Sequence, residues 1–464
     1  MQTNFSRQQL EDPRLREADA ILRRCVHCGL CTATCSTYVL LGDERDSPRG
    51  RIYMMKEMFE TGADASPQVQ THVDRCLSCL SCMTTCPGGV DYMHLVDMAR
   101  VHIEETGQRS VKDKLIRRML AAIVPYPKRF GWAVRLAPLG RPLVGLMRRI
   151  GLPELAAMVE LAPTALVARS GRFAGPGTAA TTVEKRGRVI LLAGCAQQVL
   201  RPDINDSTIR LLAAKGVDVE VAGGAGCCGA LVHHMGRERE AITMAKRNVD
   251  AWTKVIGKGQ ASGEPVDAIL INASGCGTTV KDYGHLLARE PDYAERARQV
   301  SGMARDVTEY LAEFGLGPPK RWSSLRVAYH SACSMQHGQG ITDEPKALLG
   351  TAGFTVFDVP EGHICCGSAG VYNILQPEIA GRLRERKVEN IQKARPDLIA
   401  AGNIGCITHI EKGTDIPIVH TIELLDWAYG GPVPRGLESL KGFVRDVPGP
   451  NPDVLRRPSD FIQA

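Results

Sequence analysis

The sequence predicts a multidomain α+β protein, in which a mostly α-helical N-terminal domain precedes a duplicated α/β domain that carries Cys-Cys-Gly motifs. Three observations support this fold class. Eight cysteines in the N-terminal part repeat one spacing twice, apolar strands alternate with helices from residue 188 onward, and this alternation occurs twice. A length of 464 residues allows roughly three domains.

Two cysteine motifs of identical spacing, C-x2-C-x2-C-x3-C, lie in the N-terminal part. This spacing is typical of a two-cluster ferredoxin, in which the first three thiolates bind one 4Fe–4S cluster and the fourth ligates the other cluster. We therefore expect an α-helical dicluster ferredoxin domain over residues 1–110. Its two metal sites are predicted to be Cys25, Cys28, Cys31 with Cys86, and Cys76, Cys79, Cys82 with Cys35.

Two other cysteine chemistries fit this pattern less well. Disulfide frameworks are typical of short secreted chains, whereas this N-terminus is polar and charged and does not resemble a signal peptide, so we expect a reducing, cytoplasmic setting. Structural zinc sites use separated C-x2-C pairs. Pro87 follows the second motif and Ser36 the first, a difference that affects a turn and not a ligand.

Helical patterns surround the two motifs. Apolar residues recur at helical spacing in segments 14–24, 51–60 and 91–105, and Asp-Ser-Pro-Arg-Gly at 46–50 predicts a turn. The cysteine loops are therefore expected at junctions between helices.

Residues 111–187 are expected to form a basic helical segment and a linker. Between Arg109 and Arg149 the chain contains eleven lysines or arginines and one acid, although its net charge is only +6. Prolines predict short helices there, and segment 170–187 has the composition of a linker. The rest of the chain is slightly acidic and aromatics are sparse, which argues against nucleic-acid binding. A solvated face, a surface for a partner protein and a peripheral membrane contact stay open.

A repeated α/β unit follows, over residues 188–320 and 321–464. In the first copy, the segments 188–195, 217–229 and 267–276 read as strands that end in cysteine, with a helix at 207–216. The second copy has the equivalent segments 325–333, 354–367 and 397–406. An offset of 138 residues relates the first three cysteine positions of the two copies. The stretch from the Cys-Cys pair to the last cysteine is eight residues shorter in the second copy.

These cysteines fall at the carboxyl ends of predicted parallel strands, the edge at which open α/β sheets bind ligands. Metal or cluster binding, a redox dithiol and packing as small apolar side chains are three interpretations, and packing does not account for eight cysteines in one register. The candidate cofactor-binding residues are Cys195, Cys227, Cys228, Cys276, Cys333, Cys365, Cys366 and Cys406.

These motifs, with SPRGRI at 47–52, resemble the family of iron–sulfur subunits of respiratory flavin dehydrogenases, and NASGCGTTVKDYG (272–284) and NIGCITH (403–409) look like those of glycolate oxidase iron–sulfur subunits. The resemblance implies an electron-transfer subunit of a glycolate oxidase (glycolate dehydrogenase) complex. Partner subunits with FAD would oxidise glycolate to glyoxylate, and this chain, with no catalytic residues of its own, would pass electrons to quinone or another respiratory acceptor.

The resemblance also bears on the cluster type in the repeats. Domains of the heterodisulfide reductase type hold a noncubane 4Fe–4S cluster with five cysteines. Here Ala273 and Asn403 occupy the positions three before Cys276 and Cys406, where the fifth cysteine would stand. A further iron–sulfur cluster on four cysteines remains an alternative.

Absent motifs limit the possible functions. No G-x-G-x-x-G opens a helix after a strand, so the flavin is expected on a partner. No stretch of about 18 apolar residues occurs, which leaves peripheral contact with the cytoplasmic face of the inner membrane as the expected membrane association. One alternative is an iron–sulfur subunit of a lactate or glycerol-3-phosphate dehydrogenase.

A second alternative is a catalytic thiol–disulfide or quinone reductase that acts at the Cys-Cys-Gly rim. Histidines near this rim would then move protons. They are His233, His234, His330, His337, His363 and His409.

Overall fold

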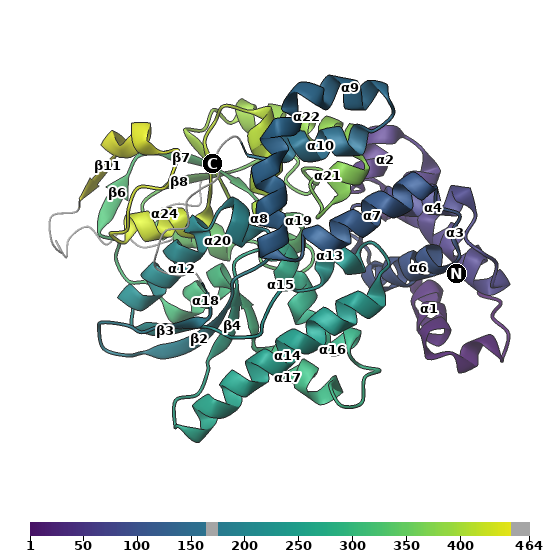
Figure 1. The fold of residues 1–464 in the computed structure, drawn as a ribbon, viewed down its shortest axis with the longest axis horizontal. Helices are drawn as coiled ribbons and strands as arrows, with labels where there is room; N and C mark the ends of the chain where they lie inside the picture. The colour runs from purple at the N-terminus through teal and green to yellow at the C-terminus, as the bar shows by residue number, and fades with distance from the viewer. Residues whose placement is uncertain (164–174, 447–464) are drawn as a thin grey trace.

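The computed structural model describes residues 1–163 and 175–446. The N-terminal helices lie on one side of the molecule, the helices of the basic segment extend from its middle to its upper edge, and the two α/β repeats form the rest (Figure 1). Among the described residues, no helix combines the length and the apolar character that crossing a bilayer requires.

The N-terminal domain is α-helical, as predicted. Its core buries Leu22, Met55 and Leu95 completely. Its helices are α1 (Pro13–Arg24), α2 (Ser36–Leu41), α3 (Pro48–Thr61), α4 (Pro67–Asp74), α5 (Ser81–Thr84) and α6 (Tyr92–Thr106).

The turn expected at 46–50 is shorter than predicted. A 3-10 turn ends at Asp46, and residues 48–50 already form the first turn of α3. The reason is local, because the Ser47 side chain accepts the Gly50 N–H at 3.0 Å as an N-cap, and Pro48 suits the first helical position.

The basic segment forms short helices, as predicted: α7 (Val111–Ile123), α8 (Pro127–Leu136), α9 (Val144–Arg149) and α10 (Pro153–Leu161). Two of its arginines are not solvated. Arg109 and Arg117 are buried and form ion pairs with Asp74 at 2.6 and 3.1 Å. The interpretation of the whole segment as a solvated face is therefore wrong for these two residues, which pack the segment against α4.

The predicted linker at 170–187 is only partly described. Residues 170–174 lie outside the described part of the chain. Residues Gly177–Ala179 form strand β1, which pairs antiparallel with β3, so this portion joins the sheet instead of bridging two domains.

Each repeat contains a parallel sheet with the same strand order, which confirms the duplication. The order is β3-β2-β4-β5 in the first repeat, with β1 added at the edge, and β8-β7-β9-β10 in the second. The strands are β2 (Gly187–Leu192), β3 (Val217–Val221), β4 (Ala268–Ile271), β5 (Ala304–Asp306), β7 (Arg326–His330), β8 (Thr355–Asp358), β9 (Leu398–Ala401) and β10 (Ile418–His420). A separate pair joins β6 (Arg321–Ser323) to β11 (Val444–Asp446).

Helices cover these sheets and connect their strands. In the first repeat they are α11 (Gln197–Leu200), α12 (Asp203–Ala214), α13 (Ala230–His233), α14 (Glu238–Ala261), α15 (Ser274–Lys281), α16 (Tyr283–Leu286), α17 (Ala294–Met303) and α18 (Val307–Phe314). In the second they are α19 (Cys333–Gln336), α20 (Glu344–Thr351), α21 (Tyr372–Leu375), α22 (Pro377–Lys393), α23 (Ile404–Ile410) and α24 (Thr421–Ala428).

The two repeats share one apolar core. Val189 and Leu270 of the first repeat belong to the same buried cluster as Val327 and Ile399 of the second. The predicted strands also end earlier than expected, so that the cysteines follow them in loops and in the first turns of helices.

Candidate metal centres

Cysteines from both N-terminal motifs line one cavity, here called the first cavity. Cys25 ends α1, Cys28 and Cys31 lie in the following loop, and Cys86 comes after α5. These are the four thiols that the spacing predicted for one cluster, and Cys82 also reaches this cavity.

The remaining motif cysteines line a second cavity. Cys35 comes from the first motif, and Cys76, Cys79 and Cys82 come from the second. The structure thus brings together both crossed sets of four thiols.

The two cysteine loops have the same backbone conformation. His27 and Gly29 in the first motif have φ of 60° and 84°, and Ser78 and Leu80 at the matching positions have 48° and 61°. A left-handed leucine costs roughly 1–2 kcal/mol. Strain of this kind concentrates at ligand sites, where it turns the loop tightly around the cavity.

Polar side chains point at the sulfur atoms of the second cavity. The Tyr92 hydroxyl donates to Cys76 Sγ at 3.7 Å, and Arg51 Nη1 donates to Cys35 Sγ at 3.8 Å. Arg51 is 1% exposed and is held by Asp46 and by the His72 carbonyl. Such donors stabilise the more negative, reduced form of a bound cluster.

Protonation of the thiols is coupled to metal binding at these cavities. Burial raises the pKa of Cys31 to about 11, and burial also raises the pKa of Cys79 and of Cys82 above the usual range. Because only thiolates ligate iron, loading either cavity releases protons.

In the first repeat, four cysteines gather at the carboxyl edge of the sheet. Cys195 follows β2, Cys227 and Cys228 precede α13, and Cys276 lies in the first turn of α15. Their thiols are neighbours, Cys195 of Cys227, Cys227 of Cys228, and Cys228 of Cys276, and this proximity together with burial raises the pKa of Cys195, of Cys227 and of Cys228.

The second repeat has the same arrangement, with Cys333, Cys365, Cys366 and Cys406 in series. Backbone conformation explains why a glycine follows each Cys-Cys pair. Gly229 and Gly367 have φ of 92° and 93°, and a Cβ at Gly367 would lie 2.7 Å from the Ala380 carbonyl oxygen.

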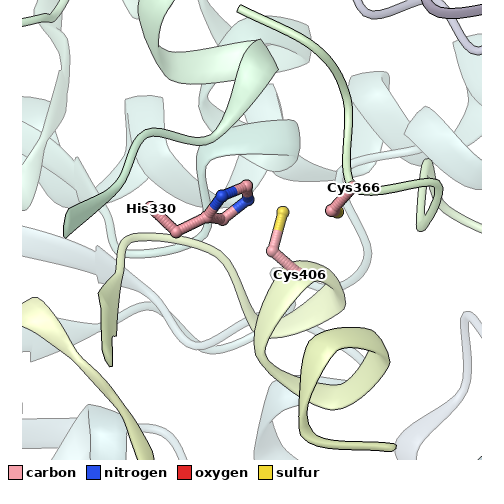
Figure 2. A group of neighbouring side chains, drawn as sticks. All are labelled: His330, Cys366 and Cys406. Carbon is pink, nitrogen blue, oxygen red and sulfur yellow. The ribbon is translucent and has the colours of Figure 1, made fainter. Parts of the chain in front are cut away.

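Additional polar side chains reach the thiols of the second repeat. His330 lies at the end of β7 beside Cys366 and Cys406 (Figure 2), and Asn403 Nδ2 donates to Cys406 Sγ at 3.5 Å. Lys387 on α22 is 1% exposed, and its ammonium group is close enough to the thiols for their charge to raise its pKa, although burial lowers that pKa more. Sequence reasoning missed Lys387, because it lies among other charged residues of an ordinary amphipathic helix.

Other histidines of the predicted rim serve structural contacts. His233 and His234 face Asp97, His337 bonds to Thr84, and His409 bonds to Asn373. Burial lowers the pKa of His337 and of His409 to about 4, so both are neutral at physiological pH and unsuited to carrying protons.

The second cavity adjoins the cysteines of the second repeat. Cys79 packs against an apolar cluster that contains Cys333 and Cys365. The Tyr372 hydroxyl donates to the Arg75 carbonyl at 3.0 Å across the same boundary. The first repeat instead meets the N-terminal domain through charged contacts, such as His94 with Asp282 at 3.0 Å.

Models of two domain families match this chain. A 4Fe-4S dicluster domain matches residues 21–90, and a cysteine-rich domain matches residues 189–281 and 327–411. These ranges contain all sixteen cysteines.

Curated relatives match nearly the whole chain. The glycolate oxidase iron-sulfur subunit of Escherichia coli is 38% identical over 428 residues, which cover 92% of this chain and 99% of the relative. A probable glycolate oxidase iron-sulfur subunit of Bacillus subtilis is 28% identical and covers 88% of this chain and 94% of the relative. Lactate utilization protein A of Oceanobacillus iheyensis is 25% identical over 52% of this chain and 96% of the relative.

The fold also occurs in a solved structure. The crystal structure of a hypothetical protein from Helicobacter pylori superposes with a TM-score of 0.51 and 8% sequence identity. It covers 92% of this chain and 74% of that one.

Proposed function

The chain belongs to the family of glycolate oxidase iron–sulfur subunits, and from this premise we propose that it passes electrons from a glycolate-oxidising flavin subunit to a respiratory acceptor. The observation that carries the proposal is the crossed gathering of eight cysteines into two cavities. A bound 4Fe–4S cluster takes up and releases one electron at a time. The flavin subunit, which would carry FAD, supplies the two-electron chemistry.

The two cavities support a ligand assignment for the two N-terminal clusters. Thiols surround each cavity, and the left-handed residues of each loop shape the backbone around it. We assign Cys25, Cys28, Cys31 and Cys86 to the first cluster and Cys35, Cys76, Cys79 and Cys82 to the second.

The repeat cysteines fit the same chemistry. Four thiols at each sheet edge offer the soft donors that iron–sulfur groups require. We assign Cys195, Cys227, Cys228 and Cys276 to one further centre and Cys333, Cys365, Cys366 and Cys406 to another.

The order of the sites supports a direction of transfer. Cys28 at the first cavity is exposed, which suits entry from a partner, whereas the second cavity is buried against the second repeat. Arg51 and Tyr92 favour the reduced state of a cluster in the second cavity, so these residues favour electron transfer from the first cluster to the second. Exit then occurs from the second repeat.

Glycolate as the substrate of the complex is supported by extent of similarity. The glycolate oxidase subunits match along about nine-tenths of this chain, whereas the lactate utilization protein matches about half of it. A reductase acting at the Cys-Cys-Gly rim has less support, because two of the six rim histidines, His337 and His409, are neutral and hydrogen-bonded to other residues.

We also propose peripheral membrane contact through the basic segment. Exposed large apolar side chains and exposed cations both occur along its helices, the composition of an interfacial segment. We call this the apolar–basic surface; it includes Val111 (84% exposed), Leu115 (66%), Trp132 (64%), Leu139 (76%), Ile150 (60%) and the exposed Lys114, Arg118, Lys128, Arg129 and Arg149. A membrane-held acceptor such as quinone would then lie near the exit site, on the cytoplasmic face.

Anaerobic co-purification with the flavin subunit tests the function. Glycolate should reduce the flavin, and acceptor reduction should require this chain with about eight iron atoms in its N-terminal sites. Replacing both Cys228 and Cys366 with alanine should abolish acceptor reduction while flavin reduction persists. Acceptor reduction by the flavin subunit alone would contradict the proposal.

A further inference from the structure

We propose that His330 supplies a nitrogen ligand to the centre of the second repeat, so that the two repeats hold chemically different iron–sulfur groups. This inference rests on the proposed binding of such a group by the Cys-Cys-Gly cysteines. It concerns a residue that lies outside every cysteine motif of the chain.

The geometry at His330 is that of a ligand. One side-chain ligand atom each of His330, Cys366 and Cys406 lies within 4.8 Å of the others, and all three residues are buried. Figure 2 shows the imidazole beside the Cys406 sulfur, with Cys366 on the other side of that sulfur. His330 is 1% exposed, and its Nε2 has no hydrogen-bond partner. A buried polar atom without a partner needs an explanation, and the two thiols beside this one make a shared ligand the explanation that fits.

The first repeat lacks this nitrogen at the matching position. In the β2–β4 pair Leu192 lies opposite Ile271, and in the β7–β9 pair His330 lies opposite Ala401. Both positions of the pair differ between the repeats. Ala401 is smaller than the isoleucine at its place in the first repeat, and this leaves room for the imidazole on the neighbouring strand. The second repeat is therefore built to hold an imidazole at its sheet edge.

A second difference between the repeats concerns charge. Gly229 approaches Ala241 on α14, and Gly367 approaches Ala380 on α22, so α14 and α22 occupy equivalent places in the two repeats. In this alignment Lys387 of the second repeat is equivalent to Asn248 of the first. Asn248 is a neutral amide that donates to the Cys227 carbonyl at 3.0 Å. Lys387 is a buried cation that donates to the Glu361 carbonyl at 2.9 Å.

Both differences leave the second repeat without added negative charge. As a ligand beside the four cysteines, the imidazole is neutral, whereas a fifth cysteine would add a negative thiolate and would give a lower potential. The Lys387 ammonium adds positive charge nearby. The second repeat, which adjoins Cys79, is thus the better electron acceptor of the two.

Pulsed EPR on the full chain with 15N-histidine tests the assignment. Wild-type protein should show a histidine nitrogen hyperfine coupling that disappears in His330→Ala. His330→Cys should restore iron lost from His330→Ala, without the coupling and with a lower midpoint potential. His409→Asn is the matched control, because His409 is buried in the same repeat with both nitrogens in hydrogen bonds; its coupling should equal that of wild type.

The outcomes separate this inference from the proposed function. A second-repeat centre whose spectrum lacks histidine coupling, or keeps it in His330→Ala, overturns the inference alone. If Cys366→Ala leaves the iron content unchanged, the repeat binds no iron, and the ligand assignment to the repeat fails together with the inference. Even where a variant does not fold, the comparison of wild-type protein with 14N and with 15N histidine shows whether a histidine nitrogen couples to a cluster.

Discussion

The backbone N–H of Cys365 donates to the Ser36 hydroxyl at 2.9 Å. Ser36 follows the last cysteine of the first motif, and Cys365 opens the Cys-Cys-Gly turn of the second repeat. Both residues are buried, so the bond joins the two cysteine systems directly. The second motif has Pro87 at the matching position, and its side chain has no group that could accept such a bond.

Ser36→Ala should therefore weaken the junction. The buried Cys365 N–H loses its acceptor, which costs about 1–3 kcal/mol of unfolding free energy. Electron transfer from the N-terminal clusters to the second repeat should slow, while the iron content stays constant. Stopped-flow reduction measures the rate, and Ser66→Ala, at the N-cap of α4, serves as a control of similar chemistry. An unchanged transfer rate in Ser36→Ala would argue against this junction as the route.

Crossed ligation makes opposite predictions for two cysteines. Cys35→Ser should damage the cluster of the second cavity, whose other ligands come from the second motif. Cys86→Ser should damage the cluster of the first cavity, whose other ligands come from the first motif. EPR of the reduced variants assigns each loss, and loss of the cluster that shares the mutated residue's own motif would show that ligation is not crossed.

Tyr92→Phe should lower the midpoint potential of the second cluster. The change removes the hydroxyl that donates to Cys76 Sγ, and one hydrogen bond of about 1 kcal/mol corresponds to roughly 40 mV for one electron. Redox titration followed by EPR measures the shift. Tyr372→Phe is the matched control, because its hydroxyl donates to the Arg75 carbonyl and not to sulfur; an equal shift in both variants would remove the role of Tyr92.

The complex should float with anionic vesicles at low salt. Attraction is expected to be about 1 kcal/mol per basic side chain and to weaken at 0.5 M salt, where the Debye length is about 4 Å. Arg118→Glu with Arg149→Glu, or Trp132→Ser with Leu139→Ser, should reduce flotation. Arg23→Glu, which changes an exposed cation of α1, should not. Flotation that both paired variants leave intact would exclude the apolar–basic surface.

Much of this architecture could be predicted from local patterns. The spacing of the motif cysteines predicted which thiols line each cavity, since the reach of a short loop limits its ligands. The offset of 138 residues predicted a second sheet with the first one's strand order. Both signals are local or periodic in the sequence.

Contacts between distant segments could not be predicted in this way. Ser36 meets Cys365 across 329 positions of the chain, and Lys387 lies in the electrostatic field of the second-repeat thiols although the pattern of its helix is ordinary. Arg117 read as a surface cation, but its ion pair with Asp74 depends on how α7 packs on α4. Such partners are chosen by tertiary packing, which composition and periodicity do not encode.

The common core of the two repeats has a consequence for how the chain can be divided. Val189 and Leu270 are buried together with Val327 and Ile399, so cleavage between residues 317 and 321 followed by separation would expose apolar surface on both fragments. Neither half can then be produced alone as a stable single-site protein. We expect the two repeats to melt in one cooperative transition, and any gene fusion or split that isolates one of them to yield aggregates.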